Sequence, residues 1–268
     1  MEQRQVFLVL IDISGYTRFT KLHRLSAMHA EQIISDLLES IIQRASHPLV
    51  VHEILGDSVN FFAFADSGRE AALEVRRQVA AIFEAFRLRE GELISDCSLC
   101  VCQACVNVGK LHLKAVLHHG QAIFTNISGF RKIAGEDVIL AHRLLKNSVP
   151  EKEYVLETEA FHQVAGAPTG FEPEARVERY EDLGEVRVRV CYPGEQEQKG
   201  PARGSRRSLL SKLRMSLRND VYYLKRLFSS PERPFHNIGA QPPLPAASAT
   251  ALFAARTHLR GMEQKSDE

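Results

Sequence analysis

The feature that most constrains this chain is a run of six apolar residues, Val6 to Ile11, that ends on a carboxylate, Asp12. A continuous apolar run of this length is typical of a β-strand that is buried on both faces of a sheet. The short segment Ile13–Thr17, which contains Ser14, Gly15 and Thr17, follows the aspartate. Asp12 therefore lies at the end of a central strand, where it either caps the next helix or belongs to a binding site.

The apolar pattern of the following residues predicts an α+β domain. Helical spacing predicts helices over 26–45, 68–89 and 135–146, and β-rich runs predict strands over 49–55, 58–64, 110–118, 121–127, 155–156 and 186–191. Gly56 and Asp57 separate the strands 49–55 and 58–64, and a Gly-Asp pair is a strong signal for a tight hairpin. This order of elements predicts an antiparallel-rich sheet with helices on one face.

The composition changes after the predicted domain, residues 1–193. We expect a linker over 194–204, a basic amphipathic helix over 205–228 and a disordered tail over 229–268. The helix suits an anionic membrane surface or an acidic protein partner, or else it docks its apolar face on its own domain. The formal net charge of +1 and the lack of a groove-reading module predict no specific nucleic-acid partner.

The compartment that we expect is the cytoplasm, with at most a peripheral attachment to the membrane. No apolar stretch approaches the roughly 20 residues that a membrane-spanning helix needs. The first residues also lack the basic start and the small-residue cleavage site of a secretory signal.

Four of the five cysteines gather within nine residues, at Cys97, Cys100, Cys102 and Cys105. In a reducing compartment, four closely spaced thiolates favour tetrahedral Zn²⁺. The competing interpretation is a set of small buried residues, because an unmodified cysteine packs as a small apolar side chain. A structural Zn²⁺ site therefore stays open against simple packing, and redox sensing is a more distant alternative.

Three segments together resemble the catalytic domain of class III nucleotidyl cyclases, the adenylate and guanylate cyclases. They are LIDISGYTRFT from residue 10, EILGDSVNFFA from residue 53 and GEDVILAHRLL from residue 135, in the order found in that family. The second and third segments, with the central cysteines, resemble more closely a bacterial family of unknown function that is similar to the cyclases. The resemblance implies a ferredoxin-like α+β core that forms a homodimer, with active sites at the dimer interface.

The resemblance implies that Asp12 and Asp57 hold the metal ions of the site. Two carboxylates beside phosphate oxygens form the hard oxygen environment that Mg²⁺ or Mn²⁺ prefers. Two such ions stabilise the attacking 3′-oxygen and the leaving pyrophosphate of a cyclase reaction. The turn after Asp12 is expected to bind the triphosphate through backbone N–H groups. The residues of this turn are Ile13, Ser14, Gly15, Tyr16 and Thr17.

Local chemistry offers another explanation for each aspartate. Asp12 could cap the following helix, and Asp57 could be the polar member of a Gly-Asp turn. For an isolated residue this is the better explanation, because turn chemistry is so common. The two can converge only if the first strand lies beside the hairpin. The matching context of both residues favours metal binding.

Two positions that select the base in the family leave the nucleotide unresolved between ATP and GTP. Glu53, four residues before Asp57, is typical of guanylate cyclases, because a carboxylate accepts hydrogen bonds from guanine N1–H and its exocyclic amine. Lys132 occupies the second position, and an ammonium group only donates, which matches neither family pattern. The two side chains could also pair with each other and close the base pocket.

The helix 135–146 departs from the family in one catalytic residue. The family has an asparagine and an arginine four residues apart on one helical face. Arg143 matches the arginine, but Ile139 stands at the asparagine position and cannot donate a hydrogen bond. The loss of one positioned donor typically lowers a rate by about 10²–10³-fold. Asn147 is too far along the axis to replace it, and we expect Ile139 to be a packed core residue.

The sequence therefore predicts a cyclase-like domain that binds a nucleoside triphosphate with a divalent metal, with Arg143 as a catalytic residue if the domain is an enzyme. Arg143 could equally be an ordinary surface or interface residue. The alternative function is a catalytically inactive module for nucleotide sensing or dimerisation in signalling. A third is a metal-stabilised adaptor that its C-terminal helix recruits to a membrane.

Overall fold

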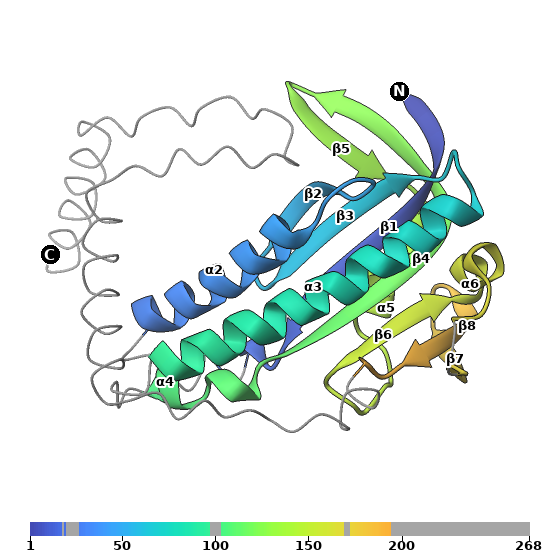
Figure 1. Ribbon diagram of the computed structural model, residues 1–268. Helices are drawn as coiled ribbons and strands as arrows, with labels where there is room; N and C mark the ends of the chain where they lie inside the picture. The colour runs from blue at the N-terminus through green and yellow to red at the C-terminus, as the bar shows by residue number, and fades with distance from the viewer. Residues whose placement is uncertain (18, 20–26, 97–102, 169–171, 194–268) are drawn as a thin grey trace, which may run out of the picture. The chain divides into compact units, whose positions relative to one another are not determined.

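The computed structural model describes residues 1–17, 19, 27–96, 103–168 and 172–193, which form an α+β fold (Figure 1). The strands are β1 (Glu2–Ser14), β2 (Val50–Leu55), β3 (Ser58–Phe64), β4 (His112–Ile127), β5 (Phe130–Ala134), β6 (Tyr154–Thr158), β7 (Glu174–Tyr180) and β8 (Gly184–Cys191). The helices are α2 (Ala27–Arg44), α3 (Arg69–Asp96), α4 (Gln103–Val106), the 3₁₀ helix η3 (Val108–Lys110), α5 (Glu136–Leu144) and α6 (Glu159–Ala165). The predicted α+β class is confirmed.

The strand β1 lies in the middle of the sheet. The strand order is β2-β3-β1-β4-β6-β8-β7, and β5 pairs with β4 outside this path. The pairing of β4 with β6 is parallel and the others are antiparallel. The side chains from Val6 to Ile11 are almost completely buried, because β3 and β4 flank the strand and both faces of the sheet are covered there. The predicted central strand is confirmed.

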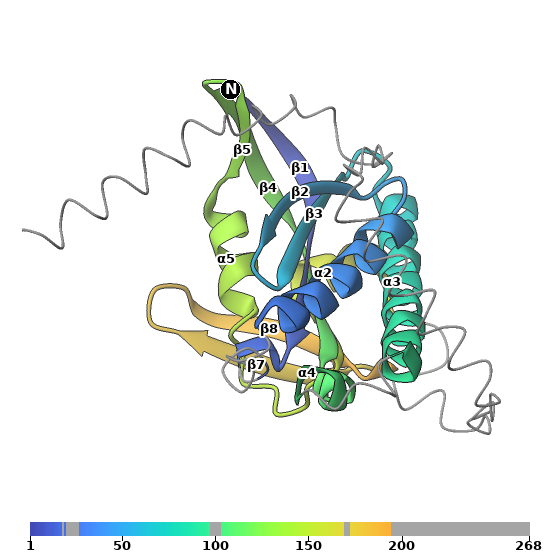
Figure 2. The ribbon, with the colours of Figure 1, turned by 90° about the vertical axis from the view of Figure 1, so that its left-hand side faces the viewer.

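The helices cover both faces of the sheet, which corrects the prediction of helices on one face, because α5 packs against the face opposite α2 and α3. The long helices α2 and α3 run side by side over one face, and the short helix α5 lies on the other side (Figure 1, Figure 2). Leu37 and Ile41 of α2 are buried at helical spacing, as predicted. On the α5 side, Leu10 of β1 belongs to the same core cluster as Leu144 of α5. Because side chains alternate between the two faces of a strand, Asp12 points to the α5 side as well.

Strand β4 differs from the prediction, which divided it at residues 118 and 121. The strand continues through Gly120 because it pairs without a break with β1, from Ser14 opposite His112 to Glu2 opposite Phe124. The elements β5, α6 and β7 were not predicted. These elements are short, and their pairing or packing partners lie elsewhere in the sequence, so local periodicity carries little signal for them.

Helix α3 extends past the predicted end at Arg89 to Asp96. Glycine at position 91 weakens an isolated helix by about 0.5–1 kcal/mol relative to alanine. Leu93 in this extension is only 2% exposed. Burial of such an apolar side chain contributes about 1.5–3 kcal/mol, which exceeds the cost of the glycine.

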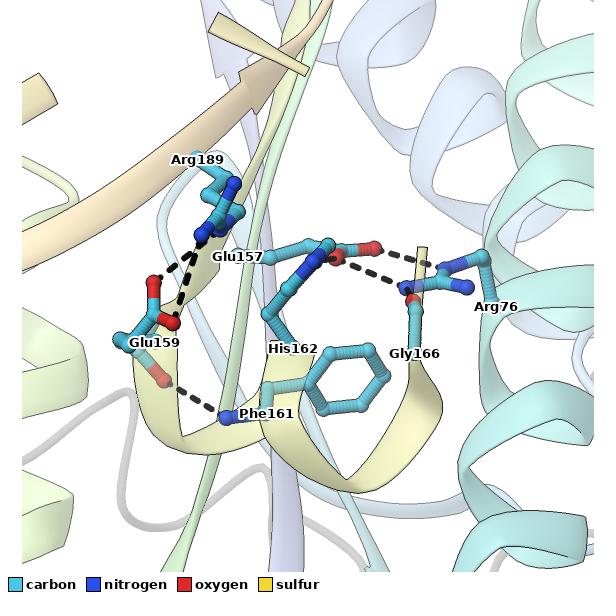
Figure 3. Close-up of polar contacts among 8 residues, drawn as sticks. Arg76, Glu157, Glu159, Phe161, His162, Gly166 and Arg189 are labelled. Atoms are coloured by element: carbon cyan, nitrogen blue, oxygen red, sulfur yellow. Dashed lines mark hydrogen bonds and ion pairs between the residues drawn. The ribbon is translucent and has the colours of Figure 1, made fainter. Parts of the chain in front are cut away.

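A buried ion pair joins α3 to the sheet. Glu157 of β6 is 1% exposed and accepts hydrogen bonds from Arg76 of α3, with Nε–Oε1 at 2.8 Å and Nη2–Oε2 at 2.9 Å. The same guanidinium donates to the carbonyl oxygen of Gly166 at 3.0 Å, and Nδ1 of His162 lies 3.3 Å from the Glu157 carboxylate (Figure 3). Arg76 therefore connects α3 to β6 through a bidentate pair with Glu157, and to the end of α6 through Gly166.

Candidate functional site

The sheet register brings the two predicted metal-binding aspartates together. Asp12 near the end of β1 lies opposite Ser58, the first residue of β3, and Asp57 directly precedes Ser58 in the β2–β3 turn. The backbone N–H of Ile13 donates to the carbonyl oxygen of Asp57 at 3.1 Å. The condition for convergence, that the first strand lies beside the hairpin, is therefore met. This N–H group is already engaged, so it is not available to a ligand.

Lys114 is a third member of this site, and the sequence did not predict it. It lies opposite Asp12 on β4, and its Nζ is 2.9 Å from Oδ2 of Asp12. Nζ also donates to the carbonyl oxygen of Leu145 at 3.0 Å. Both side chains of the ion pair are largely buried, at 19% and 18% exposure for the lysine and the aspartate. No sequence signal singles out Lys114, because only the β1–β4 register places it beside the aspartate.

The electrostatics of the site fit a cation. Burial and then the nearby Asp12 carboxylate raise the pKa of Asp57 from 3.8 to about 6, and Lys114 partly opposes this shift. Two carboxylates and one ammonium group leave one negative charge when all are ionised. Carboxylate oxygens suit Mg²⁺ or Mn²⁺, whose remaining ligands are commonly waters and substrate phosphates. Among the described residues, no three or more His, Cys, Asp or Glu side chains are grouped so that they could hold a metal ion by themselves.

The raised pKa of Asp57 predicts how the metal-free protein responds to pH. A carboxyl group with a higher pKa in the folded than in the unfolded state stabilises the fold when protonated, and this contribution is lost as the pH rises through about 6. Asp57→Asn imitates the protonated form, so the variant should melt at a higher temperature than the wild type at pH 7.5. Thermal melts in chelator should show little difference at pH 4. A variant that is less stable at both pH values would contradict this account.

The turn after β1 begins close to the aspartates. Gly15 has a φ of +96°, and a side chain there would approach the carbonyl oxygen of Lys110 at 3.0 Å. Both constraints favour glycine. Tyr16 and Thr17 are helical, and the N–H of Phe19 donates to the carbonyl oxygen of Gly15 at 2.9 Å. Burial, together with the carboxylates of Glu31 and Asp57, raises the pKa of Tyr16. The predicted turn Ile13–Thr17 thus borders the aspartate pair.

The two predicted base-selecting residues lie on different hairpins. Glu53 of β2 pairs across the strands with Asn60 of β3, and its Oε2 is 3.5 Å from Nδ2 of Asn60. Lys132 of β5 lies opposite Thr125 of β4 and is exposed. Within the described part of a single chain, no ion pair joins Glu53 to Lys132. Within one chain, therefore, Glu53 and Lys132 do not pair and do not close the base pocket.

Helix α5 presents Arg143 and Ile139 on its outer side. Arg143 is 54% exposed, and its Nη2 lies 2.9 Å from Oδ2 of Asp182, itself 68% exposed. The expectation that Ile139 is a core residue is wrong, because this side chain is 57% exposed. The inward side of α5 is formed by Ala141 and Leu144. The helical period therefore directs positions 139 and 143 outward together.

The side chain of Asn147 is hydrogen-bonded within the fold. Its Nδ2 donates to the carbonyl oxygen of Leu144 at 2.7 Å, and it also shares hydrogen bonds with the hydroxyl of Tyr154. A side chain with these partners is held next to the C-terminal end of α5. This agrees with the prediction that Asn147 does not replace the missing asparagine at position 139.

A buried histidine on β4 attaches the start of α5 to the sheet by a hydrogen bond. His118 of β4, 3% exposed, contacts Oδ1 of Asp137 through Nε2 and Oγ1 of Thr158 through Nδ1, both at 2.9 Å. Because an ionised carboxylate only accepts, Nε2 carries the proton and Nδ1 accepts from the threonine. A Cβ atom on Gly120 would collide with the Asp137 side chain, so this contact requires glycine. The group is structural, and it fixes the helix that carries Arg143.

Exposed apolar side chains occur on the elements that carry the candidate site residues. They are Ile54 and Leu55 beside the β2–β3 turn, Ile127 and Phe130 at the β4–β5 hairpin, and Ile139 on α5. Phe130 is 80% exposed. Single exposed apolar side chains are common on protein surfaces, and they form a protein–protein contact surface where they are contiguous.

A cavity of about 560 Å³ lies between α3 and the β6–β8 side of the sheet. Its lining includes Phe83, Val155 and Cys191, together with the ion-paired Arg76 and Glu157. Burial, and then the Glu157 carboxylate, raise the pKa of the Cys191 thiol to about 12, which favours the protonated thiol at neutral pH. The cavity is large enough for a small molecule. Of its charged lining residues, Arg76 and Glu157 are paired with each other.

Several predictions concern residues outside those that the structure describes. Cys97, Cys100 and Cys102 lie there, as do the linker 194–204, the basic helix 205–228 and the tail 229–268. Cys105 is described and is buried in α4. The zinc site and the membrane or partner contact of 205–228 stay predictions. In the described ranges, no helix combines the length and the apolar character needed to cross a bilayer.

The fold is that of class III nucleotidyl cyclase catalytic domains, as comparison with solved structures shows. The guanylyl cyclase Cya2 is 15% identical with a TM-score of 0.57, over 74% of this chain and 96% of that chain. The adenylyl cyclase CyaB from P. aeruginosa is 14% identical with a TM-score of 0.56, over 71% of this chain and 95% of that chain. At these identities the similarity establishes the fold alone, and it confirms the fold that the sequence resemblance implied.

Sequence comparisons match only part of the chain. The profile of a family described as "Protein of unknown function (DUF2652)" matches residues 34–154. A Mycobacterium tuberculosis protein described as "Uncharacterized protein Rv2561/Rv2562" is 32% identical over 130 residues. That match covers 48% of this chain and 59% of the length of the relative. The profile includes Glu53, Asp57 and Arg143 and begins after Asp12.

Proposed function

We propose that this chain is a class III cyclase-like domain that binds a nucleoside triphosphate together with Mg²⁺ or Mn²⁺. The observation that carries the proposal is the group of Asp12, Asp57 and Lys114 at the end of the central strand. Two adjacent carboxylates favour a divalent cation, and an ammonium group beside them favours a phosphate. A ligand that brings both charges together, a metal–triphosphate, matches this arrangement better than either ion alone.

Each side chain has a distinct part in this binding. Asp12 and Asp57 would supply oxygen ligands, and a bound cation would offset both the burial and the Asp12 repulsion that raise the pKa of Asp57. Lys114 is paired with Asp12 in the free chain and turns to a phosphate oxygen when the carboxylate binds metal. The bound metal supplies charge stabilisation for the attacking and leaving oxygens. The turn at Gly15–Thr17 offers backbone N–H groups to the same phosphates.

A second copy of the chain completes the proposed site. Arg143 lies on the exposed side of α5 in a surface ion pair with Asp182, and such pairs are weak, typically about 0–1 kcal/mol. It can therefore exchange that partner for a triphosphate bound to the other copy. The exposed apolar residues Ile127, Phe130 and Ile139 supply the contact surface for a homodimer.

Ile139 is expected to limit the catalytic rate of the domain. With Arg143 present and an exposed isoleucine one turn away, we expect cyclisation of the triphosphate to be slow. The alternative function is a nucleotide-sensing or dimerisation module without catalysis. The exposure of Ile139 favours this alternative, because an apolar residue there contributes to a dimer contact and nothing to the chemistry.

Nucleotide binding and cyclisation can be tested together. The purified chain is titrated with GTP and with ATP in Mn²⁺, and products are followed by chromatography. Asp12→Asn/Asp57→Asn should weaken binding by more than about 100-fold, since each of the two charged contacts contributes about 1.5–3 kcal/mol. Asp66→Asn, which alters an exposed surface pair with Arg4, is the matched control and should bind normally.

The possible outcomes separate the two functions. Cyclic product from the wild type that is lost in the double variant would establish a cyclase. Binding without product would establish the sensing module. Equal binding by the wild type and the double variant, or binding of neither nucleotide, would refute the proposed site.

A further inference from the structure

Asn60 is a buried polar residue with a hydrogen-bond partner for its side-chain NH₂ group but, among the described residues, none for its side-chain oxygen. It lies on β3, is 3% exposed, and among the described residues nothing donates to its Oδ1. Buried side-chain polar atoms are hydrogen-bonded in the large majority of cases, and one without a partner destabilises the fold. An apolar residue of similar size would avoid this cost. The presence of asparagine therefore calls for a reason other than stability.

Two of the neighbours of Asn60 on its face of the sheet are apolar. It lies opposite Leu10 of β1, and Phe62 is the next β3 residue on the same face. Both neighbours belong to the core cluster under α5. The polar contact of the side chain is Glu53 on β2, with Nδ2 at 3.5 Å from Oε2, the outer limit of a hydrogen bond. Because an ionised carboxylate only accepts, the NH₂ end of the amide must face Glu53.

A β-bulge creates this contact. The β2–β3 register places Val51 opposite Phe61 and then shifts, so that Glu53 lies opposite Asn60. In an unbroken register His52 would face Asn60, and the side chain of Glu53 would point to the other face of the sheet. The bulge at His52 thus turns Glu53 to the face that carries Asp12. Ser58, opposite Asp12, is two residues from Asn60, about 7 Å along the strand.

We propose that Asn60 is a positioning residue that holds the carboxylate of Glu53 for the recognition of a guanine-type base. This inference rests on the proposed nucleotide site and adds the residue that orients the carboxylate of Glu53 within it. One oxygen of Glu53 receives the amide of Asn60, and the other faces ligand N–H groups. Guanine offers N1–H and an exocyclic amine to such an acceptor. Adenine presents the lone pair of N1 at the same place, which a carboxylate repels.

The test is a double-mutant cycle on nucleotide affinity. GTP and ATP are titrated with Mn²⁺ against the wild type, Asn60→Leu, Glu53→Ala and the double variant, using the full chain and calorimetry. Asn60→Leu should weaken GTP binding about threefold to tenfold and leave ATP binding unchanged, since one hydrogen bond is at stake. In the Glu53→Ala background the same substitution should have no further effect, because Asn60 acts through Glu53. The melting temperature of metal-free Asn60→Leu should equal or exceed that of the wild type.

Several results would overturn the inference. An equal loss for GTP and ATP, additive effects of the two substitutions, or an unchanged GTP-to-ATP ratio would remove Asn60 from base selection. A lower melting temperature with an unchanged ratio would show that the residue is structural. If the wild type binds both nucleotides but the Asn60 variant keeps its preference, only this inference fails. If the wild type binds neither nucleotide, the proposed function fails with it.

Discussion

Ile139→Asn should raise the rate of triphosphate cyclisation by about 10²-fold or more. The expected size is that of one positioned hydrogen-bond donor in a transition state, about 10²–10³-fold. Ile139 lies one helical turn before Arg143, and both side chains are exposed on the outer side of α5. The substitution adds the donor that the cyclase resemblance lacks. Steady-state formation of cyclic nucleotide from GTP or ATP with Mn²⁺ measures the gain.

The folded state should tolerate this substitution. Isoleucine and asparagine have similar helix propensities, and a position exposed in the single chain has little packing to lose within the fold. Val177→Asn, at another exposed apolar residue on β7, is the matched control and should leave the rate unchanged. Adding Arg143→Ala to Ile139→Asn should abolish the gain. A rate that stays the same in Ile139→Asn, while nucleotide binding persists, would place the transition-state contacts elsewhere and favour the sensing module.

Arg76→Met should lower the free energy of unfolding by about 3–5 kcal/mol. The substitution leaves the Glu157 carboxylate, 1% exposed, without its bidentate partner, and removal of one member of a buried ion pair has this cost. The contact of Arg76 with the carbonyl oxygen of Gly166 is lost as well (Figure 3). Equilibrium unfolding in urea measures the difference.

Two further variants distinguish the stability cost of the unpaired buried carboxylate from the cost of any substitution in α3. Arg77→Met changes the next residue, which is 74% exposed and paired with Glu74, and should alter stability by less than about 1 kcal/mol. Arg76→Met/Glu157→Met removes both charges and should recover most of the lost stability. A double variant as unstable as Arg76→Met would show that the cost comes from packing and not from the buried carboxylate.

Local sequence patterns predicted the elements that build the core. The run Val6–Ile11 marked the central strand, and Gly56-Asp57 marked the hairpin that lies next to it. These signals are strong because burial on both faces and tight-turn geometry each restrict the residue types allowed. The short peripheral elements β5, α6 and β7 lacked such signals. Their existence depends on pairing and packing with distant segments.

The site was predictable only where a residue type matched a known pattern. Asp12 and Asp57 stood out because carboxylates at a strand end and a hairpin tip match the cyclase arrangement. Lys114 did not, although it contacts Asp12 directly. The register of β1 against β4 decides that contact, and a shift of one residue would turn the lysine to the other face. The exposure of Ile139 was also missed, because an apolar side chain in a short helix has no local marker of its orientation.

By itself, the amino-acid sequence determined the class of the fold, the central strand and the identity of the two acidic side chains. Apolar periodicity and turn chemistry are properties of neighbouring residues, so the chain carries them before it folds. Only the tertiary structure decided that Lys114 stands beside Asp12 and that the bulge at His52 turns Glu53 toward Asn60. These contacts join strands that are far apart in sequence or shifted in register, and hydrogen bonding across the assembled sheet sets them.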